Sequence, residues 1–261
     1  MIKTRVTEVL TDTDPKTRRW KSLFAAGRMA YEAGELRQAA SLLARARELA
    51  NELKQHTFAT NASDVGLSAI LLAEGKSREA ANKLQKTISH LRGSSENEMK
   101  ELLGVAMRFH AEALLDMGDP REAEKELKES ISILQELGIE SCVQLAYTLC
   151  DLCGLYLEQD RISEAEHFIT SAMQILFAVL GPESAEYSRA DMIYAVCQQK
   201  EEPLEMAHDG IQRMQYMYGT RHPNVSRALN RFCKVLKDRG DTVRLAKAEE
   251  RFRQPARGLK H

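Results

Sequence analysis

Residues 25–46 read AAGRMAYEAGELRQAASLLARA, and the spacing inside this stretch recurs along nearly the whole chain. Starting from Ala39, further alanines follow at intervals of 41, 43, 42, 42 and 41 residues, at Ala80, Ala123, Ala165, Ala207 and Ala248. Four positions after each alanine, one helical turn along the same face, stands a large apolar residue. These residues are Leu43, Leu84, Leu127, Ile169, Ile211 and Phe252. Such a fixed period is typical of stacked repeats and not of a domain with one core.

Each repeat reads as two helices joined by a tight turn. Twelve positions before the first five alanines the residue is small: Gly27, Ser68, Ala111, Cys153 and Ala195. Five positions before them lies a turn signal: Gly34, Gly75, Gly118, Asp160 and Glu202. Two helices approach closely only where small side chains meet, so Gly27 and Ala39 are expected to form such a contact. The pattern predicts an all-α solenoid of about six antiparallel helix pairs, in which stacking buries the apolar faces.

Helix-end signals locate the pairs along the chain. Asp14-Pro15 places an N-cap residue before a proline at the first helical position. The first helix is therefore predicted over residues 15–33 and its partner over residues 36–55. Residues 95–98, Ser-Glu-Asn-Glu, have the spacing of a capping box and predict the start of the third unit.

The repeat divides the chain into three parts. Residues 1–14 do not fit the period and are predicted to form an N-terminal extension or a capping helix. Residues 15–253 form the repeat domain, and residues 254–261 a flexible basic tail. The last 43 residues, 219–261, carry a net charge of +8, against −9 for the rest. That basic end is either an ordinary solvated cap or a surface for an acidic partner or nucleic acid.

Composition fits a water-soluble helical protein. Hydrophobic residues make up 43% of the chain and aromatic residues only 6%, and no apolar stretch is long enough for a signal peptide or a membrane span. The five cysteines are an odd number placed inside predicted helices, which favours buried thiols in a reducing compartment. A cytoplasmic location is therefore expected.

The recurring small residue, turn glycine, alanine and large apolar residue resemble the consensus of the tetratricopeptide repeat (TPR) family over residues 20–253. That family usually repeats about every 34 residues, and a period near 42 is similar to its kinesin light chain subtype. Two phrases support the subtype: LGPES at residues 180–184 and YGTRHPNVSRALNRF at residues 218–232. Of that subtype's paired asparagines only Asn230 is present. The resemblance implies a right-handed superhelix whose ligand lies in a concave groove lined by the first helix of each pair.

Groove positions follow from the resemblance, carried over residue by residue. They are Phe24, Arg28, Tyr31, Leu72, Arg108, Glu112, Leu115, Tyr147, Leu157, Arg189, Met192, Val196, Arg227, Asn230 and Lys234. This wall is apolar in the middle and basic at both ends. It suits an extended or helical peptide with an apolar centre and acidic flanks.

Chemistry beyond binding is not indicated. Cys150 and Cys153 form a single CxxC without a second pair, and Cys153 also occupies the small-residue position, so packing is favoured over a zinc site. No histidine neighbours a nucleophile at a catalytic spacing. We expect no enzymatic activity, cofactor or metal.

The leading hypothesis is a protein–protein interaction scaffold that binds a peptide or helical segment in the groove. One alternative is a signalling or transcription-associated regulator that senses a peptide or small molecule and touches nucleic acid through its basic last unit. Another is a structural repeat protein that assembles with itself end to end.

Overall fold

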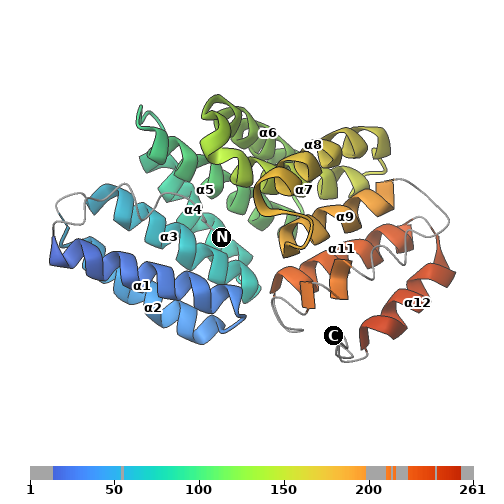
Figure 1. Ribbon diagram of the computed structural model, residues 1–261, viewed down its shortest axis with the longest axis horizontal. Helices are drawn as coiled ribbons and strands as arrows, with labels where there is room; N and C mark the ends of the chain where they lie inside the picture. The colour runs from blue at the N-terminus through green and yellow to red at the C-terminus, as the bar shows by residue number, and fades with distance from the viewer. Residues whose placement is uncertain are drawn as a thin grey trace. The chain divides into compact units, whose positions relative to one another are not determined.

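A computed structural model describes residues 14–53, 56–197, 210–212, 214–215, 223–238 and 240–253. All secondary structure in these ranges is helical. The chain divides into two compact units, Met1–Thr148 and Leu149–His261, and the helices are shown in Figure 1. The predicted extension at residues 1–14, apart from Asp14, and the predicted tail at residues 254–261 lie outside the described residues.

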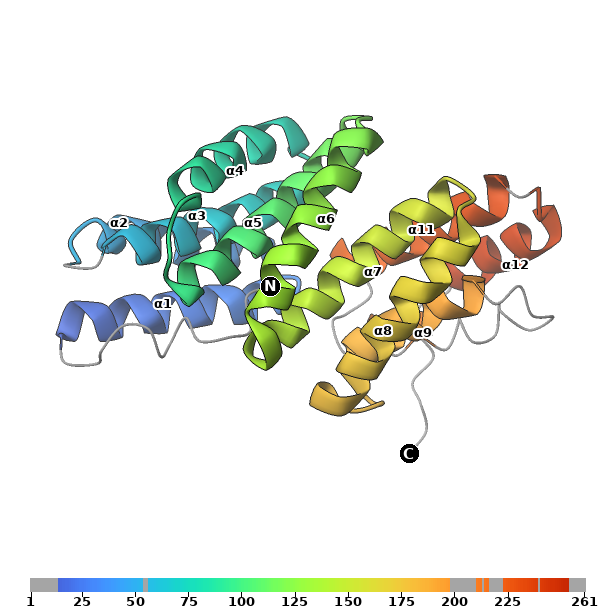
Figure 2. The same cartoon turned by 90° about the horizontal axis from the view of Figure 1, so that it is seen from above.

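The first unit is a stack of helices in sequence order. Its helices are α1 (Pro15–Glu32), α2 (Leu36–Ala50), α3 (His56–Ala73), α4 (Ser77–Leu91), α5 (Asn97–Asp116) and α6 (Pro120–Glu136), followed by the short 3₁₀ helix η1 (Gly138–Ser141). Each α-helix packs against the next, and α3 also touches α1 and α5. Figures 1 and 2 show α1 to α6 as neighbouring hairpins. The first helices of successive pairs therefore lie beside each other.

The second unit continues the same pattern. Helix α7 (Cys142–Glu158) crosses the division at Thr148, and α8 (Ile162–Leu180), α9 (Ala185–Cys197), α11 (Pro223–Asp238) and α12 (Thr242–Arg253) follow. Within this unit α8 packs on α9, α9 on α11, and α11 on α12. The second helix of the fifth pair was predicted around Ala207, which lies outside the described residues.

The repeat positions fill the cores of the helix pairs. All described alanines of the period are completely buried, and the apolar residue one turn later is at most 1% exposed. The described alanines are Ala39, Ala80, Ala123, Ala165 and Ala248. The described apolar residues are Leu43, Leu84, Leu127 and Ile169, one turn after the first four alanines, and Ile211, one turn after position 207. The predicted packing role of the period is confirmed at these positions.

The small residue in α1 allows a close approach, although its neighbour differs from the prediction. A Cβ atom on Gly27 would lie 2.7 Å from Leu43 Cγ and 3.3 Å from Leu42 Cβ. The expected contact was Ala39, one turn earlier on α2. Side chains lean towards the N-terminus of their helix, which brings Leu43 over the glycine. Glycine is required here because a side chain at this position would clash with Leu43, which is fully buried and cannot move away.

The turns between paired helices use one backbone conformation. Gly34, Gly75 and Gly118 have φ of 76°, 76° and 84°, a left-handed region that glycine enters without a steric penalty. At the equivalent position of the fourth pair stands Asp160, with φ of 60°. The turn signals of the sequence therefore mark positions that need a left-handed backbone conformation. Asp160 adopts this conformation at a steric cost that glycine does not have.

Two helix boundaries were predicted incorrectly. The second helix was expected to reach residue 55, but α2 ends at Ala50, because the amides of Asn51, Glu52 and Leu53 bond three residues back instead of four. The third unit was expected to begin with a capping box at residues 95–98. Helix α5 instead begins at Asn97 after Glu96, without a side-chain cap.

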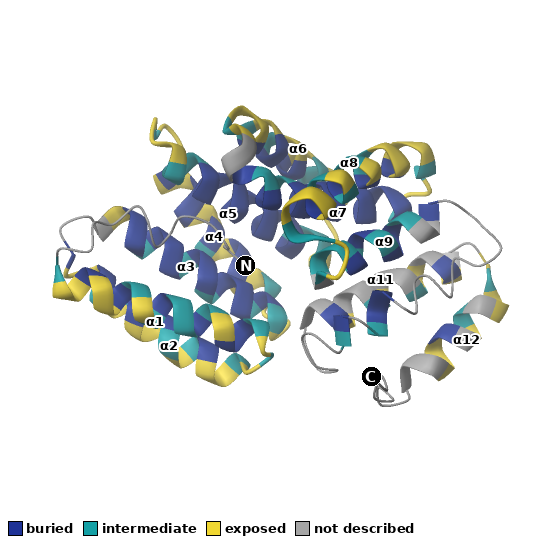
Figure 3. Cartoon of the chain, in the orientation of Figure 1, coloured by how far each residue is buried: buried dark blue, intermediate teal, exposed yellow. Residues whose placement is uncertain are grey.

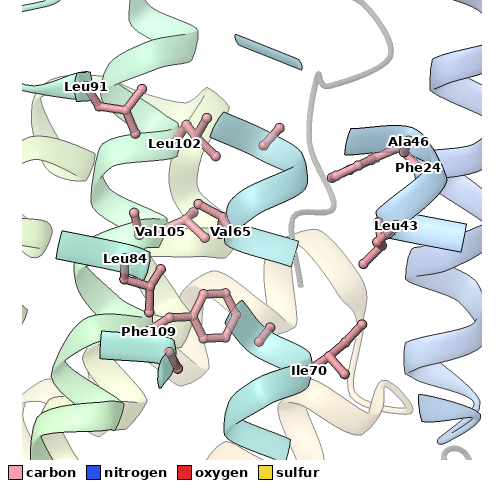
Figure 4. Packing of buried hydrophobic residues seen from close by; sticks show 14 of the residues in the cluster. Phe24, Leu43, Ala46, Val65, Ile70, Leu84, Leu91, Leu102, Val105 and Phe109 are labelled. Atoms are coloured by element: carbon pink, nitrogen blue, oxygen red, sulfur yellow. The ribbon is translucent and has the colours of Figure 1, made fainter. Parts of the chain in front are cut away.

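The core of the first unit is continuous. Figure 3 shows the buried residues running through α1 to α6, and Figure 4 shows Leu43, Val65, Leu84 and Phe109 among its apolar side chains. Trp20, the only tryptophan, is fully buried and donates from Nε1 to Ser63 Oγ of α3 at 3.1 Å. In the part of the chain that the structure describes, no helix has the length and apolar character needed to cross a lipid bilayer.

Candidate functional site

The predicted groove residues all lie on the first helix of a pair. These helices are α1, α3, α5, α7, α9 and α11, and we call the predicted residues on them the first-helix face.

Helix α5 is the most deeply buried helix of the first unit and still carries charge. Every residue from Glu101 to Ala113 is buried. Arg108 is 5% exposed and Glu112 8%, one turn apart on the same face. Charged residues are rarely this buried unless they are paired or serve a function. This part of the first-helix face is therefore not an ordinary solvated helix surface.

The opposite side of α5 has a simple structural explanation. His110 Nδ1 lies 2.8 Å from Glu126 Oε2 of α6, and both side chains are nearly enclosed. Ser130 Oγ of α6 donates to the carbonyl of Gly104 at 2.8 Å. These contacts hold α5 against α6 within one helix pair.

Arg108 points from α5 towards α7. Its Cζ lies 4.2 Å from the ring centroid of Phe109 and 5.7 Å from that of Tyr147. A guanidinium over aromatic rings is stabilised by the ring quadrupole, most strongly where water is excluded. The predicted residues Arg108, Glu112 and Tyr147 are thus brought into one region of the first unit.

Helix α1 supplies a more apolar part of the first-helix face. Phe24 stacks on Trp20 with 5.1 Å between ring centroids, and both Phe24 and Tyr31 are buried. Arg28 is half-buried, and its Nε lies 3.8 Å from Glu32 Oε1. Arg28 is the residue of this group that reaches solvent.

In the second unit, ion pairs join the first helices. Arg189 of α9 binds the buried carboxylate of Asp151 on α7. Lys234 of α11 donates to Glu158 Oε2 of α7 at 3.0 Å. The second pair connects helices two repeats apart, so α7 and α11 approach each other along this face.

The predicted residues fall into three groups by exposure. The buried ones are Phe24, Tyr31, Leu72, Arg108, Glu112, Tyr147, Leu157 and Met192. Arg28, Leu115 and Arg189 are half-buried, while Asn230 and Lys234 are exposed. The side chains of Val196 and Arg227 lie outside the described part of the structure.

Three residues of this region were missed by the sequence analysis. Asp151 and Glu158 were not among the predicted groove residues. Gln144 lies three residues before Tyr147 on α7 and was not considered. Their only sequence signal is position, because residues 144, 147, 151 and 158 share one face of a helix.

Thiol chemistry is not favoured by the surroundings of the cysteines. All five are free, and Cys153 donates to the carbonyl of Ala165 at 3.2 Å, which joins two repeat positions. Burial, with a smaller contribution from Glu249, raises the pKa of the Cys233 thiol, which disfavours the reactive thiolate. Within the described ranges, no three His, Cys, Asp or Glu side chains are grouped to hold a metal ion.

Comparison with known proteins identifies the fold. No protein-family model matches the sequence, and no curated protein matches it either. Among solved structures, the chain is similar to a Rap protein complexed with competence and sporulation factor, with a TM-score of 0.75 and 12% identity over 90% of this chain. It spans 63% of the length of that Rap protein.

Two further structures are similar. The Rap conjugation gene regulator of plasmid pLS20, in complex with the Phr* peptide, has a TM-score of 0.74 and 13% identity, covering 97% of this chain and 68% of the regulator. A kinesin light chain protein of Podosopora anserina with nearly identical TPR-like repeats has a TM-score of 0.51 and 18% identity, covering 78% and 96%. The fold is therefore an all-α solenoid of TPR-like helix pairs.

Proposed function

We propose that this protein binds a peptide or a helical segment of a protein partner along the first-helix face. The observation that carries the proposal is the burial of Arg108 and Glu112 on α5, at positions where packing alone favours apolar residues. The similarity in fold to a Rap regulator in complex with the Phr* peptide supports it. The function is binding without turnover, in a cytoplasmic setting.

The ligand has an apolar centre and acidic flanks. Leu115 and Arg28 are half-buried, so they are the apolar and basic side chains placed for direct contact. Arg189 and Lys234 already bind Asp151 and Glu158. A carboxylate of an acidic ligand would replace Asp151 or Glu158 as the partner of Arg189 or Lys234. Because salt screens such ion pairs, the affinity for the ligand should fall as salt is added.

The proposal is tested by selecting peptides on the purified protein. A displayed library of random dodecapeptides supplies a binder, whose affinity is then measured by fluorescence anisotropy. Leu115→Glu places a charge on the first-helix face and should weaken binding about tenfold or more. Met117→Glu makes the same change at an exposed position two residues on and serves as the control.

Two results would contradict the proposal. One is a library that yields no binder. The other is a binder whose affinity falls equally with Leu115→Glu and Met117→Glu, since the loss would then come from charge in general and not from the first-helix face.

A second candidate function rests on α11. Asn230, Lys234 and Lys237 are exposed and follow one another at helical spacing, in the segment with the basic surplus. A regulator that touches nucleic acid through this helix would bind nonspecific duplex DNA at low salt and lose that binding in the double variant Lys234→Glu, Lys237→Glu. The absence of a gel shift at low salt would contradict this second candidate function.

A further inference from the structure

One side of α1 is exposed, although the same side of the next first helices is buried. Arg18, Ser22 and Met29 lie along this side and are exposed, Met29 to 64%. Their counterparts one period on in α3 and two periods on in α5 are at most 2% exposed. These counterparts are Ala59, Ser63 and Ile70 in α3, and Leu102, Ala106 and Ala113 in α5. We call Arg18, Ser22, Ala25 and Met29 the free face of α1.

The helix pair that precedes each first helix accounts for this difference. Helix α3 packs on α2, and α5 packs on α4. A Cβ atom on Gly66 of α3 would lie 3.0 Å from Leu43 Cδ1 of α2, and the counterpart of Gly66 on α1 is Ala25 of the free face. Helix α1 is the first helix that the structure describes. Its free face therefore lies where the later first helices meet a preceding second helix.

Residues 1–10 have the pattern of the end of a second helix. The alanine that marks the period has no counterpart among residues 1–14, but positions later in the second helices do. Ile2, Val6 and Val9 stand one period before positions in α2 and two periods before positions in α4. These positions are Leu43, Arg47 and Ala50 in α2, and Leu84, Ile88 and Leu91 in α4. Five of the six are buried, and the sixth, Arg47, binds Asp64 of α3.

The spacing to the following helix agrees with this alignment. The last residues of α2 and α4 precede the first residues of α3 and α5 by six positions. Their counterpart Val9 also precedes Pro15, the first residue of α1, by six positions. The chain therefore has the same number of residues in which to reverse direction before α1 as it has before α3 and α5.

Arg5 departs from the apolar pattern without placing a charge against α1. Its counterparts Ala46 and Thr87 are buried. In the third pair the same position is Ser130, which donates to the carbonyl of Gly104 on α5 at 2.8 Å. Because α5 is the first helix of the same pair, this position faces the partner within a pair and not the first helix of the next pair. The charge of Arg5 is therefore compatible with packing on the free face.

We propose that residues 2–10 form a helix that covers the free face of α1, as α2 covers α3. An α-helix rises about 1.5 Å per residue, so this segment spans about 13 Å and the stretch from Arg18 to Ala25 about 10 Å. In this alignment Ile2 contacts Ala25, and Val9 lies at the level of Arg18. The chain itself thus caps the first end of the stack, where a repeat array otherwise exposes a surface for further stacking. The inference goes beyond the proposed function, because it involves no ligand.

Leu10 provides the matched control for a test of this alignment. It stands next to Val9, but its counterparts Asn51 and Arg92 are exposed polar residues. The alignment therefore places Val9 against α1 and Leu10 at the edge, in contact with water.

The first experiment measures hydrogen–deuterium exchange of the full chain by mass spectrometry. A helix this short is unstable alone, so packing on α1 should slow exchange of the amides of residues 6–10 about tenfold or more relative to a free peptide of the same sequence. Val9→Glu should abolish this protection, because it buries a charge against α1, and Leu10→Glu should retain it. Exchange of the wild type at the free-peptide rate overturns the proposal, as does an equal loss of protection in both variants.

The second experiment identifies what lies on the free face. The photoreactive residue p-benzoylphenylalanine in place of Met29, one helical turn beyond Ala25, should cross-link to residues 1–5 of the same chain. The same residue in place of Met117, which is 44% exposed, is the control and should not reach that segment. A cross-link between two chains would assign the free face to a second copy and overturn the proposal. The absence of any cross-link from position 29 to residues 1–10 would overturn it as well.

Both experiments are done without a peptide ligand. Their failure would leave the proposed peptide binding untouched, and failure of the peptide selection would leave the cap of α1 untouched.

Discussion

Single residues show how the repeat tolerates departures from its own pattern. The turn needs a left-handed residue, which Gly34, Gly75 and Gly118 provide. The small position needs a residue that lets the helices approach, and it accepts both Gly27 against Leu43 and Cys153 bonded to Ala165. The backbone requirement is the stricter of the two, because a non-glycine residue there is strained in any surroundings.

Asp160 provides a direct test of this requirement. Asp160→Gly places glycine at a φ of 60° and should stabilise the second unit by up to about 1 kcal/mol. Asp160→Ala should destabilise it by a similar amount. Urea unfolding followed by circular dichroism measures both changes, and a loss of stability in Asp160→Gly would show that the Asp160 side chain contributes more than the strain it causes.

At the scale of helices, local signals predicted much of the fold. Asp14-Pro15 and Asp119-Pro120 mark the starts of α1 and α6, where each aspartate accepts from a nearby helix amide. These starts were predictable because a cap involves only four or five neighbouring residues. The capping box at residues 95–98 has the same chemistry in sequence but does not form, because α5 begins at Asn97 and Glu96, not Ser95, occupies the N-cap position.

The candidate site was less predictable because it depends on contacts between repeats. The helices that carry Arg108, Tyr147 and Arg189 followed from the period. Their burial did not, since residues of the same type on a helix face are usually solvated. The pairing of Arg189 with Asp151, 38 residues away, depends on how two repeats stack, which no short sequence signal encodes.

The pair between α7 and α9 should contribute to stability. Arg189→Met leaves the buried Asp151 carboxylate without this partner and should destabilise the second unit by on the order of 3 kcal/mol. Adding Asp151→Asn should recover much of that loss, because the stranded charge is removed. Glu164→Gln, which disrupts the exposed pair with Arg161, is the control and should change stability by less than about 1 kcal/mol.

Urea unfolding of wild type, Arg189→Met, Asp151→Asn and the double variant gives the coupling between Arg189 and Asp151. A cost in Arg189→Met no larger than that in Glu164→Gln would mean that the pair has no structural role.

At the scale of the whole chain, the repeat period runs through a structural division. Cys153 and Ala165 keep the spacing of the earlier repeats, yet the chain separates into two compact units at Thr148, inside α7. Uniform sequence spacing therefore does not imply uniform packing, because each repeat contacts mainly its neighbours.

The division predicts two unfolding transitions. Trp20 is the only tryptophan and lies in the first unit, so its fluorescence reports that unit while circular dichroism reports all helices. The two urea transitions should not coincide, since each unit is compact by itself. Superimposable curves that shift together in Asp160→Gly would show that the units unfold as one.

The central claim is that the first helices bind the ligand. Hydrogen–deuterium exchange with and without a selected peptide tests it most directly, because protection is read along the whole backbone. We predict protection in α1, α3, α5 and α7, with little change in α2, α4, α6 and α8. Protection confined to the second helices, or no protection at a saturating concentration of peptide, would contradict the account.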